Sequence, residues 1–218
     1  MKLESVGILV NIRPFNERDS IARIFTYDHG VLCGMMRGAV VAKKNRPLVG
    51  QYGNVAWNAR LDSQLGVFHW DAERNLAAIL MTSAERLGYM TAAFDLISTM
   101  LPERARYEML FSETISLLRD LNLASVPAAA YLEWETKLLR ELGYALDLTH
   151  CSGCGATHNL NYLSPRTGRA VCDECAAPYI DKIYKLPLTL NTTLRFLDAV
   201  CAQQGISVPQ SRRMLGHV

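Results

Sequence analysis

The chain has 218 residues and a mass of 24.3 kDa, enough for one large domain or two small ones. Half of its residues are apolar and a fifth are charged, which is ordinary globular composition and argues against long disorder or a fibrous repeat. No apolar run approaches the roughly 18 residues that a membrane span needs, and no signal-peptide pattern is present. We therefore expect a cytoplasmic chain that does not associate with a membrane.

The first 75 residues carry the short, β-branched apolar runs that are typical of strands. The runs lie at residues 6–12, 21–27, 31–36, 52–59 and 64–70. Between the second and third run, Asp28-His29-Gly30 has turn chemistry, because Gly30 can adopt a positive φ. Five short strands suit a small barrel. An OB fold is the natural choice, although an SH3-like barrel has the same strand count.

From Asp71 onward the apolar period becomes helical. Thr82 and Glu85 have the spacing of a capping box, and the helix that they open is expected to run to about Thr99. Further helices are predicted to begin at Pro102, at Ser125 to Pro127 and after Pro187, the last of them closed by Gly205. We therefore predict an α+β chain with an OB-fold barrel at residues 1–75 and an all-α domain at residues 76–218.

Four of the six cysteines form two Cys-x2-Cys pairs, namely Cys151 with Cys154 and Cys172 with Cys175. Without an export signal, this spacing indicates a metal site and not a disulfide framework. Four thiolates suit tetrahedral Zn²⁺ and leave no position for water, so we expect a structural ion. The intervening residues are predicted to form a short hairpin. This predicts a zinc-ribbon-like module at about residues 149–177, inserted in the helical domain. His150 and His158 flank the site as alternative ligands.

The other two cysteines, Cys33 and Cys201, have no partner at motif spacing and are predicted to be buried core thiols. The sequence contains no phosphate-binding loop, no dinucleotide fingerprint, no Gly-x-Ser-x-Gly elbow and no zinc-deaminase motif. We therefore expect a binding protein and not an enzyme.

Positive charge is concentrated in the N-terminal region. Residues 1–75 carry ten Lys or Arg against seven acids, whereas residues 76–218 carry thirteen against fourteen. No acid occurs between Asp28 and Asp62. The cations in that interval are Arg37, Lys43, Lys44, Arg46 and Arg60. Such an interval is either a solvated loop or an anion-binding face, for which nucleic acid is the leading ligand.

Several short motifs follow one another along nearly the whole chain. They are Arg13-Pro14-Phe15-x-Glu17-x-Asp19-x-Ile21, Phe25-Thr26-x3-Gly30, Arg37-Gly38-Ala39, Leu138-Leu139-Arg140-Glu141-Leu142-Gly143-Tyr144-x-x-Asp147-Leu148 running into the first Cys pair, and Tyr162-Leu163-Ser164-Pro165 before the second. In this order and spacing the chain resembles the RecO family of bacterial recombination mediators. The resemblance implies an N-terminal OB fold, a helical domain and, as in many members, a four-cysteine zinc module. In one departure, Val40-Val41 follows Ala39 where the family often has a basic doublet.

The resemblance also implies a function. Members bind single- and double-stranded DNA, anneal complementary strands, and work with RecR and the single-stranded-DNA-binding protein to help RecA onto coated DNA. The candidate phosphate contacts are then Arg37, Lys43, Lys44 and Arg46. Phe15, Tyr52 and Trp57 could stack bases, although packing within the strands is the more ordinary role for each.

Three helix cations are candidates for docking the acidic C-terminal tail of the single-stranded-DNA-binding protein: Arg119, Lys137 and Arg140. The alternative for these residues is an ordinary surface ion pair, such as Lys137 with Glu133 or Glu141. Two other functions stay open for the whole chain. One is a zinc-ribbon protein-interaction adaptor without direct DNA binding, and the other is a nucleic-acid-processing enzyme.

Overall fold

The structure is a computed structural model that describes residues 1–61 and 64–215. It contains two compact units, one of Met1–Tyr131 with Pro209–Leu215 and one that spans Leu132–Val208. The strands of the first unit end at Asn75 and its helices begin at Leu80. The division into domains at residues 75 and 76 stays a prediction. No helix in the described residues combines the length and apolar character that crossing a membrane requires.

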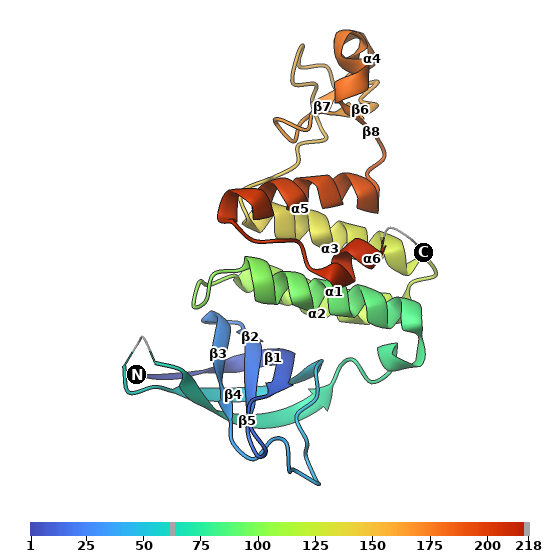
Figure 1. Ribbon diagram of the computed structural model, residues 1–218. Coiled ribbons are helices and arrows are strands. Elements are labelled where there is room, and N and C mark those ends of the chain that lie inside the picture. Colours follow the sequence, from blue (N-terminus) through green and yellow to red (C-terminus); the bar gives the residue numbers. More distant parts are fainter. Residues whose placement is uncertain (62–63, 216–218) are drawn as a thin grey trace. The chain divides into compact units, whose positions relative to one another are not determined.

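Five strands close into a barrel in the order β1-β2-β3-β5-β4 (Figure 1). Their bounds are β1 Lys2–Pro14, β2 Ser20–Thr26, β3 Gly30–Met36, β4 Gln51–Asn58 and β5 Gly66–Asn75. Neighbouring strands are antiparallel, except that β3 and β5 pair in parallel at Gly34–Gly66 and Met35–Val67. A five-stranded barrel of this kind is the predicted OB-fold architecture.

Alternating apolar side chains fill the barrel, because successive residues of a strand face opposite sides. The buried cluster consists of Leu9, Ala22, Ile24, Leu32, Met36, Ala39, Val55, Trp57 and Phe68. Trp57 is only 1% exposed, and its indole N–H donates to the carbonyl oxygen of Cys33 at 2.9 Å. The indole is therefore a core group and is not available to stack on a base.

Two strands are longer than the sequence pattern indicates. β1 runs from Lys2 because it pairs with both β2 and β4. β5 continues to Asn75, although the apolar period suggests a helix from Asp71. The end of β5 is mostly exposed, so it has no apolar alternation, and its pairing with β4 holds it in the sheet.

The helical elements follow the barrel. Their bounds are η1 Leu80–Thr82, α1 Ala84–Met100, α2 Glu108–Leu123, α3 Pro127–Glu141, α5 Leu190–Gln204 and α6 Gln210–Met214. Ser83, and not Thr82, caps α1 by accepting the N–H of Arg86 at 3.4 Å. α2 begins at Glu108 and not at Pro102, where the sequence predicts a helix to begin. The segment before it runs alongside β3, because Val31 and Glu103 form a parallel bridge and Arg104 donates its N–H to the carbonyl of Val31 at 3.0 Å.

A small cysteine module lies between α3 and α5 in the sequence. It contains a three-stranded sheet in the order β7-β6-β8 and two short helical turns (Figure 1). The bounds are β6 Tyr162–Leu163, β7 Ala170–Val171, α4 Asp173–Ala176, η2 Ala177–Lys182 and β8 Tyr184–Lys185. The hairpin of β6 and β7 confirms the predicted zinc-ribbon-like layout. The third strand, β8, pairs with β6 and was not predicted.

The glycine where β3 meets β5 yields a stability prediction. A Cβ added at Gly66 would lie 2.1 Å from the ring of Trp57, whereas one at Gly88 within α1 would lie 3.7 Å from Leu215. Gly66→Ala should therefore lower the free energy of unfolding by about 1–3 kcal/mol through overpacking. Gly88→Ala, the matched control, should raise it by about 0.5–1 kcal/mol. Urea unfolding compares the two variants, and equal stabilities would contradict the overpacking.

Candidate nucleic-acid interface and metal centre

The four candidate phosphate contacts are exposed side chains of the connection between β3 and β4. This basic connection spans residues 37–50 and carries Arg37, Lys43, Lys44 and Arg46. None of the four forms an ion pair with a residue that the structure describes. Their charge is therefore not neutralised within the described part of the chain.

The start of the basic connection is attached to the loop between β1 and β2. The carboxylate of Asp19 accepts the backbone N–H of Gly38 at 2.8 Å, and Val40 donates its N–H to the carbonyl of Arg18 at 3.0 Å. The hydrogen bond from Gly38 is the main cause that lowers the pKa of Asp19, and the charge of Arg37 acts in the same direction. The carboxylate is thus ionised at neutral pH and fixes this end of the connection.

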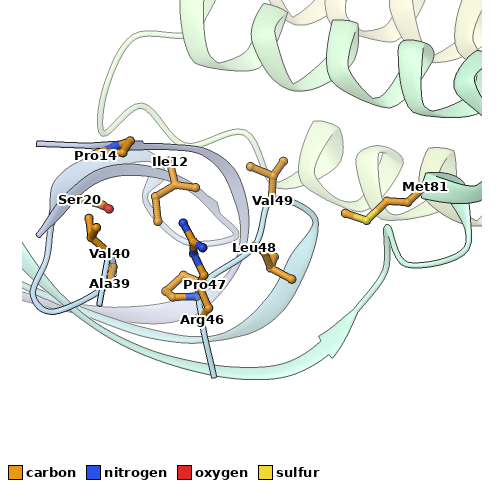
Figure 2. Close-up of a pocket in the computed structure, with 10 residues that line it drawn as sticks. All are labelled: Ile12, Pro14, Ser20, Ala39, Val40, Arg46, Pro47, Leu48, Val49 and Met81. Carbon is orange, nitrogen blue, oxygen red and sulfur yellow. The ribbon is translucent and has the colours of Figure 1, made fainter. Parts of the chain in front are cut away.

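Further along, the connection forms one wall of a pocket of about 330 Å³ beside β1 and β2 (Figure 2). The lining residues are Ile12, Pro14, Ser20, Ala39, Val40, Arg46, Pro47, Leu48, Val49 and Met81. Arg46 is the charged residue in this otherwise mostly apolar set, and Figure 2 shows its side chain among the apolar ones. An apolar hollow beside a cation can accept a flat ring that carries a phosphate.

The three aromatic candidates differ in how open their rings are. Phe15, between β1 and β2, is 57% exposed. Tyr52 is partly buried, and the guanidinium of Arg74 lies 5.2 Å from the centre of its ring. Trp57 is enclosed in the barrel. Phe15 is therefore the best placed of the three to stack on a base.

The three helix cations also differ in their partners. Arg119 on α2 pairs with Asp120 at 2.9 Å, and Lys137 on α3 pairs with Glu133 at 2.9 Å. The pair of Lys137 with Glu133 is an ion pair between residues four apart on one helix, which is the alternative to partner docking that the sequence leaves open for Lys137. Arg140 is exposed and has no ion pair among the described residues. Of the three, Arg140 is therefore the side chain whose charge is open to an acidic partner.

The four paired cysteines converge on one point. The sulfur atoms of Cys151, Cys154, Cys172 and Cys175 all lie within 4.8 Å of one another, and those of Cys154 and Cys172 are 3.6 Å apart. A tetrahedral site with Zn–S bonds of about 2.3 Å separates its sulfurs by about 3.8 Å. In the described residues this cluster contains cysteines alone, without His150 or His158. The donor set thus fits a four-thiolate metal ion.

Backbone hydrogen bonds lower the pKa of one of these thiols, whereas the closeness of the other sulfurs raises the pKa of another. Gly153 and Cys172 donate their backbone N–H groups to the Sγ of Cys151 at 3.4 and 3.3 Å. The bond from Cys172 is the main cause that lowers the pKa of Cys151 to about 6. The neighbouring sulfurs, Cys172 first, raise the pKa of Cys175 to about 12. A divalent cation would stabilise all four groups as thiolates and remove this conflict.

The remaining cysteines lie outside this cluster. Cys201 is buried, as predicted. Cys33 is only half-buried, because its position on β3 leaves part of the side chain in solvent, and burial raises the pKa of its thiol. The prediction that Cys33 is a buried core thiol was therefore wrong.

Comparisons with known proteins agree over nearly the whole chain. Residues 1–70 match the family model described as Recombination protein O N terminal, and residues 81–211 match Recombination protein O C terminal. A DNA repair protein RecO from Ruegeria sp. (strain TM1040) is 36% identical over 182 residues, which cover 83% of this chain and 76% of the relative. The protein of the same name from Jannaschia sp. (strain CCS1) is 38% identical over 191 residues, 87% of this chain and 78% of the relative.

The thiol cluster predicts a bound metal. We expect elemental analysis of the purified chain to find about one zinc ion per molecule, and Co²⁺ in its place to give thiolate-to-metal charge-transfer bands. Cys154→Ser, which changes an exposed ligand, should lose the metal, and protease should then cut the module more readily. Cys33→Ser is the matched control and should keep the metal. Equal zinc content in the two variants would contradict the assignment.

Proposed function

The chain belongs to the RecO family, and from this membership we propose that it is a DNA-binding recombination mediator. It binds single- and double-stranded DNA and anneals complementary strands. Together with RecR, it helps load RecA onto DNA that is coated by the single-stranded-DNA-binding protein. Its work is binding and positioning, with no covalent bond made or broken. The name that the relatives share, DNA repair protein, supports a role in repair.

The observation that carries this proposal is the unneutralised charge of the basic connection on an OB-fold barrel. Two DNA strands repel each other, so annealing requires cations that lower the repulsion as the strands approach. Lys43, Lys44 and Arg46 are exposed and have no ion pair among the described residues, so they can contact phosphates directly. Each such contact releases counterions from the DNA, which makes binding strongly dependent on salt.

Neighbouring groups on the barrel support binding to bases as well as phosphates. Arg46 lines the pocket beside β1 and β2, and Phe15 lies in the loop that joins these strands. OB folds bind single strands by combining a positive groove with aromatic rings on which bases stack. We therefore assign phosphate contact to the basic connection and base contact to Phe15 and the pocket.

The proposed cofactor is a structural Zn²⁺ ion held by the four clustered cysteines. Bound there, it would crosslink the two Cys-x2-Cys segments and saturate its own coordination shell, which leaves no position for catalysis. The buried apolar cluster around these cysteines is small, so the ion would supply stability that the module's core lacks.

The proposed protein partner of the helices is the acidic tail of the single-stranded-DNA-binding protein. Arg140 is the residue to which this proposal assigns the carboxylate contact, because Arg119 and Lys137 already pair with acids. A guanidinium can bind a carboxylate through two parallel hydrogen bonds, so one open arginine can anchor an acidic peptide.

Removing charge from the basic connection tests the DNA-binding function. Lys43→Ala combined with Lys44→Ala should weaken binding to oligonucleotides of any sequence. The plot of log affinity against log salt should become flatter by about one unit for each lost phosphate contact. Fluorescence anisotropy at several salt concentrations measures this slope. The same variant should slow annealing of complementary oligonucleotides that are precoated with the single-stranded-DNA-binding protein.

A second variant with the same loss of charge serves as the control. Lys2→Ala with Arg106→Ala removes two exposed cations that pair with acids, Lys2 with Glu4 and Arg106 with Glu108, and it should leave the slope unchanged. An unaltered slope in the Lys43 and Lys44 variant would show that these two lysines do not contact DNA phosphates. Absence of any salt-dependent DNA binding by the unaltered chain would favour the adaptor function. Cleaved DNA in the presence of a divalent metal would favour an enzyme.

A separate titration tests the partner surface. Arg140→Ala should weaken binding of a labelled peptide with the sequence of the acidic tail by about tenfold, the size expected for a lost charge-assisted hydrogen bond. Arg140→Lys should restore part of the affinity, and Arg106→Ala should not change it. Equal affinity for the Arg140→Ala variant and the unaltered chain would remove this residue from the partner surface.

A further inference from the structure

We propose that the unit Leu132–Val208 carries a second strand-binding surface, which takes single-stranded DNA along the cysteine module. Two pockets of this unit, of about 510 and 450 Å³, share Ile183 in their lining. The charged and aromatic residues of the pair, which we name the module surface, are Arg166, Tyr179, Lys182, Tyr184, Lys185 and Arg195. Residues 182–185, which line one or both pockets, include β8. Figure 1 shows that the chain leads from β8 into α5.

Four of the five cations of this unit that are exposed and have no ion pair among the described residues gather on the module surface; the fifth is Arg140 on α3. Residues 132–208 contain seven Lys or Arg against eight acids, a nearly neutral balance. Elsewhere in the unit, Lys137 pairs with Glu133 and Arg169 with Asp147. The four cations of the module surface are all exposed, and none pairs with an acid among the described residues. Among the described lining residues of the two pockets there is no Asp or Glu, so the ionised side chains other than Cys175, a metal-ligand candidate that lines one of them, are cations.

The two tyrosines of the module surface are placed for different tasks. Tyr179 is 59% exposed, so its ring can stack on a base. Tyr184 packs edge-on against Phe196, with the ring centres 5.8 Å apart, and the guanidinium of Arg195 lies 5.1 Å from the centre of its ring. Stacking of this kind orients an arginine, which suits the fork-like binding of a phosphate.

The order of these groups favours single-stranded nucleic acid over other anionic ligands. Along Tyr179 to Lys185 two rings alternate with two cations, and the one acid of the segment, Asp181, lines neither pocket. Each of the two pockets also holds an arginine from another segment. A single strand presents phosphates and unpaired flat bases in the same alternation. An acidic peptide offers carboxylates without a series of flat rings, and duplex DNA keeps its bases stacked inside, away from Tyr179.

This inference rests on the proposed annealing function and deepens it. A chain with one DNA-binding surface must find the complementary strand free in solution. A chain that binds one strand at the basic connection and another at the module surface confines both to one molecule, which raises their effective concentration. The structure thus assigns the second strand to the module surface.

Counting bound strands tests the proposal. Native mass spectrometry with a dT oligonucleotide of about eight nucleotides should find two oligonucleotides on the unaltered, metal-loaded chain. Lys182→Ala with Lys185→Ala should leave one, and adding Lys43→Ala with Lys44→Ala should weaken the binding of that remaining strand. Annealing by the Lys182 and Lys185 variant should be at least fivefold slower. Tyr179→Ala should weaken binding to the module surface about fivefold or more, and Tyr179→Phe should not.

Controls separate this surface from general damage. The module variants should keep their zinc and their urea midpoint, and Lys2→Ala with Arg106→Ala should still bind two strands. Ultraviolet crosslinking of a bromodeoxyuridine oligonucleotide to the unaltered chain avoids mutation altogether and should recover a peptide that contains Tyr179.

Different outcomes overturn different statements. Two bound strands and normal annealing in the Lys182 and Lys185 variant, or crosslinks confined to the barrel, would overturn the second surface while the proposed function stands. The second surface would also be overturned if an acidic peptide bound at Tyr179 and DNA did not bind there. A chain that binds no oligonucleotide and anneals no strands would overturn the proposed function itself.

Discussion

The parallel pairing of β3 with β5 closes the barrel, and the DNA-binding surface proposed on it depends on that closure. Gly34 and Gly66 pair there, and the bare backbone at Gly66 makes room for the ring of Trp57. Closure also separates β3 from β4, since β5 lies between them in the barrel. The two strands cannot be joined by a tight hairpin, so the residues between them form a long exposed connection. The candidate DNA-binding cations lie on that connection.

An exposed connection with unneutralised cations must be held at its ends if it is to offer a defined surface. At its start, the carboxylate of Asp19 accepts the N–H of Gly38. At its end, Gly50 donates its N–H to the carbonyl of Leu9 at 2.8 Å. Lys43 and Lys44 lie between these attachments, and mutual repulsion between them is weak because water and salt screen exposed charges. The connection therefore holds its cations near one another at little cost.

Much of this fold could be predicted from local sequence signals, and the exceptions have physical reasons. The barrel strands follow from alternating apolar residues, and the cluster of four cysteines follows from Cys-x2-Cys spacing, because both signals are local. The end of β5 and the short strand β8 escaped prediction, since the first is polar and exposed and the second has only two residues. The pocket around Arg46 and the module surface also escaped, because distant segments assemble them. The interleaved rings and cations of Tyr179 to Lys185 were the one local signal that could have suggested the second surface.

The cysteine cluster affects both the stability of the cysteine module and the shape of the pocket that holds Arg166 and Tyr179. The buried core around the cysteines contains few large apolar side chains, so packing alone gives this segment little resistance to unfolding. Cys175, a member of the cluster, also lines the pocket that holds Arg166 and Tyr179. A Cβ on Gly153 would lie 2.9 Å from the sulfur of Cys175, so the chain must approach the cluster closely here. An ion that fixes the four sulfurs would therefore fix the wall of this pocket as well. A structural metal can in this way set the geometry of a binding surface without touching the ligand.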